Sequence, residues 1–326
     1  MALQLSQQAG GWCRQLPTPL AGLALGISGL GMCLDFVLQA NGRLELVTMT
    51  LAALLLLALA TRFTLDLPSL GNDLRHPVVG SVVPTFAMAL MVVSHGLSLL
   101  HADLGTAVWV LAIGLHGWFL AQFIRHRRQE FAMHHMVPSW FVPPVGIAVA
   151  AVSWSGTVGS WSYLLAWGCM AFALACYAIM LPWMFYRLIF HPTIPEGAQP
   201  TIAILAAPAS LTLAAYLRVA TDPSPLLVMI LLGVAVTMTL IVYVALLHLL
   251  RLPFSPGFAA LTFPLAIGAT ALFKVQAFFI DWALPGDIIL QVQTLARIEL
   301  AIATVVISYV AVRYAIWLAK LRGAAQ

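Results

Sequence analysis

The sequence predicts an all-α integral membrane protein, with ten transmembrane helices arranged as five helical hairpins around a central pore. Of its 326 residues, 62% are hydrophobic and 8% are charged, whereas about 25% of the residues in a soluble domain are charged. Apolar windows of about 20 residues, the length that crosses a bilayer, recur along the whole chain. Prolines occupy matching places in alternate windows. The first two observations predict a membrane protein, and the third predicts the hairpins.

Charged or turn-forming segments separate the ten apolar windows, and none of these segments is long enough for a separate soluble domain. We therefore predict a single transmembrane domain over residues 1–326, with short cytoplasmic tails at 1–16 and 319–326. Numbered in chain order, odd helices leave the cytoplasmic side and even helices return to it. The predicted helices cover residues 18–38, 44–65, 77–100, 104–124, 137–155, 160–188, 200–219, 225–249, 256–280 and 290–318.

The distribution of basic residues predicts the orientation, because cytoplasmic loops of membrane proteins are enriched in Lys and Arg. Eleven of the 15 Lys and Arg residues fall on the side where the chain begins: Arg14, Arg62, Arg75, Arg125, Arg127, Arg128, Arg187, Arg251, Arg313, Lys320 and Arg322. The other four are Arg43, Arg218, Lys274 and Arg297. We therefore expect both termini in the cytoplasm. The basic run at 125–128 is interpreted as a topology signal rather than as a ligand site.

The odd helices share a proline pattern. A proline inside a helix removes one hydrogen bond, and in a membrane the freed group must face protein or a water-filled cavity. Four odd helices carry one proline at the start and another six to eight residues later: Pro77 and Pro84, Pro138 and Pro144, Pro200 and Pro208, and Pro256 and Pro264. The first helix has Gly26 seven residues after Pro19 instead. Among the even helices, only 160–188 contains an interior proline, Pro182.

This alternation predicts that the odd helices are kinked and line a pore, while the even helices lie outside them and face lipid or neighbouring subunits. The candidate pore-lining residues at the kinks are Gly26, Pro84, Pro144, Pro208 and Pro264. The alternative is that proline and glycine only adjust helix packing, because both are frequent in membrane helices. For a single proline the packing explanation is stronger, whereas the coordinated set favours the pore.

The predicted pore has the chemistry of a passive pathway. The central parts of the odd helices contain no charged residue, whereas an obligatory charged binding site in a membrane would contain one. Weak stabilisation by backbone dipoles and hydroxyl groups lets a permeating ion leave quickly. Phe263, directly before Pro264, could project into the axis and block it. The alternative is a phenylalanine that packs between helices.

Other classes of function lack support in the sequence. The Lys and Arg residues are too scattered for a nucleic-acid surface, and the four cysteines show no CxxC spacing. No nucleophile–base arrangement or phosphate-binding motif is present, so we expect no enzyme, no metal and no cofactor. Arg297 and Glu299 lie two residues apart and point to different helix faces. We expect them at the outer interface or between subunits.

Four short motifs carry a resemblance to a known family. They are Leu16-Pro17-Thr18 with Gly22 and Leu25-Gly26, then Arg75-His76-Pro77, then Pro200-Thr201 to Ala207-Pro208, and finally Pro253-Phe254 leading to Thr262-Phe263-Pro264. By their order and spacing, the chain resembles the tellurite-resistance/dicarboxylate transporter family over nearly its whole length. This family includes bacterial tellurite-resistance proteins and the slow anion channels of plants.

The resemblance implies a homotrimer in which each protomer has its own pore, lined by the five odd helices. It implies a gate formed by a phenylalanine of the ninth helix, at the position of Phe263. It also implies that Gly22 and Leu25 line the pore in the first helix.

The expected function is an anion channel of the bacterial inner membrane that passes small anions such as chloride or nitrate. The alternative is a proton-coupled transporter that exports tellurite or C4-dicarboxylates such as malate. A coupled transporter needs a titratable group, and the candidates for it are Asp35, His95 and Glu299. In either case the partners are small inorganic or organic anions and the lipid bilayer.

Overall fold

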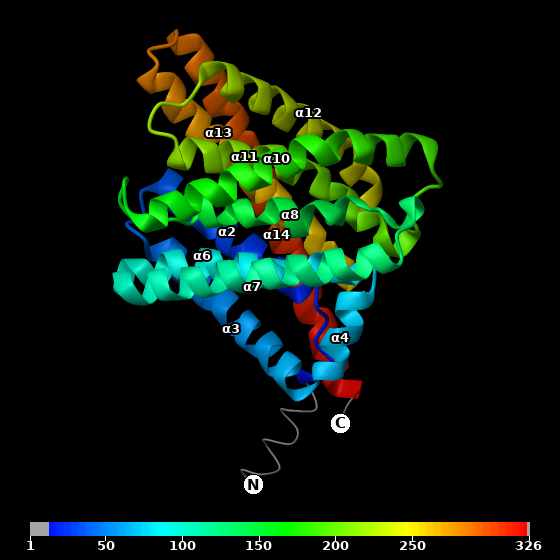
Figure 1. The fold of residues 1–326 in the computed structure, drawn as a ribbon. Coiled ribbons are helices and arrows are strands. Elements are labelled where there is room, and N and C mark those ends of the chain that lie inside the picture. The colour runs from blue at the N-terminus through cyan, green and yellow to red at the C-terminus, as the bar shows by residue number, and fades with distance from the viewer. Residues whose placement is uncertain (1–12, 325–326) are drawn as a thin grey trace.

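The computed structural model describes residues 13–324, which form a bundle of helices (Figure 1). Within this range no β-strand occurs, so the prediction of an all-α protein is confirmed. The outer parts of the two predicted tails, 1–12 and 325–326, lie outside the described residues. The α-helices are α2 (Leu20–Leu38), α3 (Arg43–Leu65), α4 (Leu67–Arg75), α5 (Val79–Val82), α6 (Thr85–Leu100), α7 (Ala102–Gln129), α8 (Val142–Val145), α9 (Val149–Val152), α10 (Trp161–Phe190), α11 (Ala207–Val219), α12 (Pro225–Leu249), α13 (Phe263–Asp281) and α14 (Gly286–Ala324). The 3₁₀ segments are η1 (Met133–His135), η2 (Pro138–Phe141), η3 (Gly146–Ala148), η4 (Glu196–Ala206) and η5 (Pro256–Leu261).

Nine helical spans among the described residues are long and apolar enough to cross a membrane. They correspond to nine of the ten predicted windows. The remaining window, 137–155, contains a shorter apolar segment, Pro138–Val152, in which η2, α8, η3 and α9 follow one another. The prediction of a multi-pass membrane protein is thereby confirmed, while a tenth crossing by Pro138–Val152 stays a prediction.

The polar connection between the second and third spans forms the short helix α4. Asp66 precedes it as N-cap, and its carboxylate accepts a hydrogen bond from the backbone N–H of Ser69 at 3.1 Å. Pro68 lies in the first turn. A backbone N–H at this position would have no partner within the helix, so the proline removes no hydrogen bond. These capping residues allow a nine-residue helix to form between two membrane spans.

The inner proline of each predicted kink marks a change from one helix to another. Pro84 is the N-cap of α6, whereas Pro208 and Pro264 lie in the first turns of α11 and α13. The chain before α11 and α13 forms the 3₁₀ segments η4 and η5. A proline in the first turn of a helix removes no hydrogen bond, because that N–H has no partner within the helix. The inner prolines at 84, 208 and 264 therefore coincide with changes of helical structure inside the candidate spans Val79–Leu100, Glu196–Val219 and Pro256–Asp281.

Helix α2 departs from this design. It is one uninterrupted α-helix from Leu20 to Leu38, so the expectation that all five odd helices are kinked is wrong for the first of them. Glycine keeps its N–H and so does not by itself break a helix. At Gly26, a Cβ atom would lie 2.3 Å from Oγ1 of Thr262 and 3.1 Å from the backbone nitrogen of Phe263. The missing side chain therefore permits close packing of α2 against the start of α13.

The odd segments form an inner layer and the even helices an outer one. In the most apolar window of each candidate span, 61–83% of the residues are buried in α2, α5–α6, η4–α11 and η5–α13, but only 28–39% in α3, α7, α10, α12 and α14. The inner segments contact one another in a closed order: α2 with α6, α6 with α9, α9 with α11, α11 with α13, and α13 with α2. Each outer helix packs on the inner segment that precedes it. In Figure 1, the outer helices α7 and α10 cross the front of the bundle.

A buried ion pair joins three elements at the end of the molecule where the inner segments begin. The Arg62 guanidinium lies 2.9 Å from the Asp73 carboxylate, and it donates hydrogen bonds to the hydroxyl groups of Thr18 and Ser69 at 2.6 and 2.8 Å. These contacts connect the start of α2 to α3 and α4. At the same end, the Tyr314 hydroxyl of α14 donates to the Pro256 carbonyl. The start of the first span and the end of the last span thus lie on one side of the molecule (Figure 1).

Candidate functional site

The ring of inner segments encloses a cavity of about 270 Å³. All five predicted odd helices contribute to its wall, for example through Leu25, Thr85, Phe141, Pro208 and Phe263. Backbone turns and short apolar side chains dominate this wall, and a few hydroxyl groups interrupt it. Among the described residues that line the cavity, none has an ionisable side chain. The cavity therefore offers a small hydrophobic space without a fixed charge.

Five of the eight sequence-predicted site residues line this cavity: Gly22, Leu25, Pro208, Phe263 and Pro264. Gly22 and Leu25 lie one turn apart on α2, and the other three lie in the first turns of α11 and α13. The structure therefore brings together residues that are up to 242 positions apart in the chain (264 − 22).

The other three predicted residues, Gly26, Pro84 and Pro144, do not line the cavity. Gly26 faces Thr262 in the contact between α2 and α13. Pro84 is the N-cap of α6 and Pro144 lies in the short helix α8, and their neighbours Thr85 and Val145 line the cavity instead. Sequence reasoning missed Thr85, although it directly follows the proline that marks the break.

Phe263 lies at the inner end of the cavity. Its side chain also lines a second cavity of only about 10 Å³, together with Gly29 and Met32 further along α2. A Cβ atom at Gly29 would lie 3.4 Å from the Phe263 ring, so the ring packs against a helix surface that carries no side chain there. The second cavity has room for about one water molecule. The space inside the ring of helices is thus narrow from Phe263 onwards, and Phe263 itself is 7% exposed.

Several α-helices start at the cavity wall, among them the long helices α6, α11 and α13. Thr85, Pro208 and Phe263 are residues of the first turns of α6, α11 and α13, and all three line the cavity. The N-terminal end of an α-helix carries a partial positive charge and favours a nearby anion, by about 0.3–1 kcal/mol at exposed sites. The arrangement can therefore stabilise a small anion weakly without a charged side chain.

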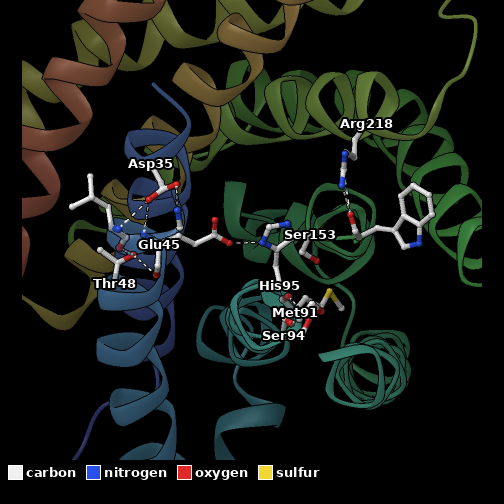
Figure 2. Close-up of polar contacts among 12 residues, drawn as sticks. Asp35, Glu45, Thr48, Met91, Ser94, His95, Ser153 and Arg218 are labelled. Carbon is white, nitrogen blue, oxygen red and sulfur yellow. Dashed lines mark hydrogen bonds and ion pairs between the residues drawn. The ribbon is translucent and has the colours of Figure 1, made fainter. Parts of the chain in front are cut away.

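The three candidate coupling groups lie away from both cavities. Asp35 belongs to α2, and its carboxylate reaches the start of α3 (Figure 2). There it accepts hydrogen bonds from the backbone N–H groups of Gly42 and Leu44 at 2.8 and 3.0 Å. The same view shows His95 of α6 paired through Nδ1 with the carboxylate of Glu45. These contacts give Asp35 a capping role and His95 a role in joining α6 to α3.

Glu299 is buried between α13 and α14, where it is 3% exposed. A Cβ atom at Gly268 would lie 2.7 Å from Oε2 of Glu299, so the carboxyl group packs against the backbone of α13. The expectation that Glu299 lies at the outer interface or between subunits is therefore wrong, whereas Arg297 is exposed. Residues two positions apart on a helix point to different faces, and the face that carries Glu299 is buried inside the protomer.

Comparison with known proteins adds the family to this geometry. The family described as voltage-dependent anion channel (SLAC1) matches residues 15–315, a range that contains all five inner segments, four of their outer helices and most of α14. The chain belongs to this family. The resemblance that the sequence motifs carry is thereby confirmed, and membership places the protein in a family of anion channels and transporters.

Two archaeal proteins are related to this member of the SLAC1 family. Uncharacterized transporter MJ0762 of Methanocaldococcus jannaschii is 26% identical over 232 residues, which cover 64% of this chain and 67% of that protein. Uncharacterized transporter MJ0576 of the same organism is 29% identical over 146 residues, which cover 40% of this chain and 41% of that protein. Both relatives are named as transporters, in agreement with the family match.

Proposed function

We propose that the protein is a passive anion channel of the bacterial inner membrane, conducting small anions such as chloride and nitrate through the cavity of each protomer. One observation carries the proposal: an uncharged cavity inside the helix ring is lined by first-turn residues of several α-helices, α6, α11 and α13 among them, and the Phe263 ring lies between it and the small second cavity. The helix ends favour anions over cations. The absence of a charged group from the described cavity wall keeps anion binding weak, as fast conduction requires.

In this proposal Phe263 is the gate. The ring lies between the two cavities and packs against Gly29, so a change of its rotamer would join them. Residues Gly22, Leu25, Pro208 and Pro264 line the wider part of the pathway. Gly26, Pro84 and Pro144 act indirectly, by setting how closely the inner segments approach one another.

The same proposal includes ten crossings, cytoplasmic termini and a homotrimer. The start of the first span and the end of the last one lie on the same side of the molecule, which favours an even number of crossings and hence a tenth one by Pro138–Val152. The excess of Lys and Arg on that side favours the cytoplasm. The trimer rests on the family resemblance alone, and the mass of the intact complex, measured by native mass spectrometry in detergent, tests it.

The alternative is a proton-coupled transporter of tellurite or of C4-dicarboxylates. Glu299 favours it, because burying a carboxyl group in a membrane helix costs free energy, and carboxyl groups that are kept there commonly belong to proton or ion pathways. Glu299 forms no ion pair within 4 Å with any described residue. It lines neither cavity, however, and so has no direct contact with the proposed pathway.

Anion flux into vesicles distinguishes the two functions. We expect purified protein in liposomes to pass chloride and nitrate down their gradients, with the same initial rate whether or not a pH gradient is imposed. Glu299→Gln should leave this flux within about twofold of the wild type. Uptake of malate or tellurite only under a pH gradient, abolished by Glu299→Gln, would overturn the channel in favour of the coupled transporter.

A further inference from the structure

An apolar groove lies between α4 and α7, at the end of the molecule where the inner segments begin. It has a volume of about 330 Å³, and its floor is formed by Leu67, Leu70 and Leu74 of α4 and by Trp118 of α7. Leu67 is 67% exposed and Trp118 is 45% exposed. Because α7 is an outer helix, this groove opens on the outer surface of the bundle, the surface that faces lipid or a neighbouring subunit.

One end of the groove is basic. Arg75, Arg125 and His126 belong to its wall, and the same three residues line an adjoining cavity of about 380 Å³. Arg127 and Glu130 also line this second cavity. The apolar groove therefore continues directly into a space with three arginines and a single carboxylate.

None of these arginines forms an ion pair within 4 Å in the described part of the chain. Among the described residues, the ion pairs within 4 Å are Arg62 with Asp73 and His95 with Glu45, so Glu130 pairs with none of the three arginines. Arg127 is only 5% exposed. Its guanidinium donates one hydrogen bond to the backbone carbonyl of Arg75, and its buried Nε–H has no partner in the described part of the chain. The positive charge that the adjoining cavity offers to a ligand therefore comes mainly from the exposed side chains of Arg75 and Arg125.

We propose that the groove and the adjoining cavity bind one anionic phospholipid. The phosphate group lies among Arg75, Arg125 and Arg127, and one acyl chain lies along the leucines of α4 beside Trp118. Guanidinium groups bind phosphate oxygens through paired N–H donors, and basic pockets beside membrane helices bind acidic lipid headgroups. A soluble anion would use the basic cavity but leave the apolar groove empty, so the combined shape favours the lipid.

This site is independent of the proposed conduction pathway, because it shares no residue with either cavity along the helix ring. It also gives the basic run at 125–128 a second role beside that of a topology signal. In the folded protein Arg75, fifty positions earlier in the chain (125 − 75), completes the site.

Binding of a fluorescent phosphatidylglycerol to the whole protein in detergent micelles tests the proposal. We expect unlabelled phosphatidylglycerol to displace the probe, and phosphatidylcholine and inorganic phosphate to displace it at least tenfold less well. The double variant Arg75→Gln/Arg125→Gln should bind the probe about 30-fold more weakly. Both side chains are exposed, so the variant should keep the helical content and the unfolding temperature of the wild type.

The matched control is Arg14→Gln/Arg251→Gln, which removes the same charge from two exposed arginines outside the groove. This control should bind the probe within about threefold of the wild type. Equal weakening in both double variants would reduce the effect to general surface charge and overturn the proposal. Displacement by inorganic phosphate as effective as by phosphatidylglycerol would also overturn it, in favour of a soluble anion.

Discussion

At the scale of single residues, two glycines of α2 have different surroundings near the start of α13. A Cβ atom at Gly22 would meet the Cβ of Ala259 at 3.4 Å, an ordinary contact. At Gly26 the same atom would lie 2.3 Å from Oγ1 of Thr262, the residue directly before Phe263. The two glycines share one helix, yet only Gly26 sets the distance between α2 and the start of α13.

We predict opposite effects for Gly22→Ala and Gly26→Ala. Gly26→Ala should lower the free energy of unfolding by about 1–3 kcal/mol, because α2 and α13 must move apart or Thr262 must change rotamer. Gly22→Ala should be neutral or stabilising by up to about 1 kcal/mol, since alanine is the better helix former. Denaturant titrations of both variants in the same detergent measure the difference. Equal effects would mean that the contact of Gly26 with Thr262 does not limit the packing.

A second prediction at this scale concerns Arg62. Arg62→Gln should lower the free energy of unfolding by about 3 kcal/mol, because it leaves the largely buried Asp73 carboxylate without its cation. The matched control is Arg14→Gln, which removes the same charge from an exposed position and should change stability by less than about 0.5 kcal/mol. A small effect of Arg62→Gln in the same titration would contradict the joining role of this ion pair.

Single residues were also where prediction from sequence reached its limit. Phe263, Pro208 and Pro264 could be predicted as pore-lining residues, because a proline marks a break in a helix. The residues beside such a break are candidates for lining the space between the helices. Glu299 could not be placed, since the sequence of α14 does not say which face of the helix meets α13. Helical periodicity is weak when nearly every position is apolar, as it is throughout this chain.

At the scale of the element, three of the four proline pairs accompany two consecutive helices, whereas Pro138 and Pro144 lie in a segment of four short helical elements, η2, α8, η3 and α9. The sequence predicts where the break falls but not its form, because a missing N–H is compatible both with a kink in one helix and with the first turn of a new one. The 11-residue 3₁₀ segment η4 illustrates the second outcome, and such long 3₁₀ runs are uncommon. No propensity rule distinguishes 3₁₀ from α-helix over Glu196–Ala206, so tertiary packing decides it.

The position of Pro264 in the first turn of α13 leads to a prediction for this element. Pro264→Ala should change the free energy of unfolding by less than about 1 kcal/mol, because no hydrogen bond is regained. Ala269→Pro, inside the same helix, should lower it by about 3 kcal/mol or more. Detergent unfolding of both variants provides the comparison. A large effect of Pro264→Ala would indicate that the proline holds a bend in a continuous helix after all.

At the scale of the whole molecule, the sequence predicts the division into inner and outer helices because the proline pattern alternates. It does not predict the closed order of the inner segments, which depends on contacts between residues far apart in the chain. It also does not predict the apolar character of the cavity, since the wall is assembled from one or two turns of each segment. The pathway is therefore a property of the closed ring and not of any one helix.

Cysteine accessibility along α2 tests that pathway. Leu25 lines the larger cavity and Met32 the small one beyond Phe263. In a variant whose four native cysteines are replaced, Leu25→Cys should react with a small water-soluble thiol reagent. Met32→Cys should react at least tenfold more slowly, until Phe263→Ala is added and the two rates become similar. Fast reaction of Met32→Cys with Phe263 intact would contradict closure by this ring.

The most direct measurement of the central claim is the current carried by Phe263→Ala in planar bilayers under chloride and nitrate gradients, beside the wild type and Phe273→Ala. Phe273 is a buried phenylalanine of the same helix that lines neither cavity, and it controls for loss of ring packing. The account predicts a current at least tenfold larger for Phe263→Ala alone, reversing near the anion equilibrium potential. Two results would contradict it: a current through correctly folded Phe263→Ala that is no larger than that of the wild type, or an equal increase of the current in Phe273→Ala.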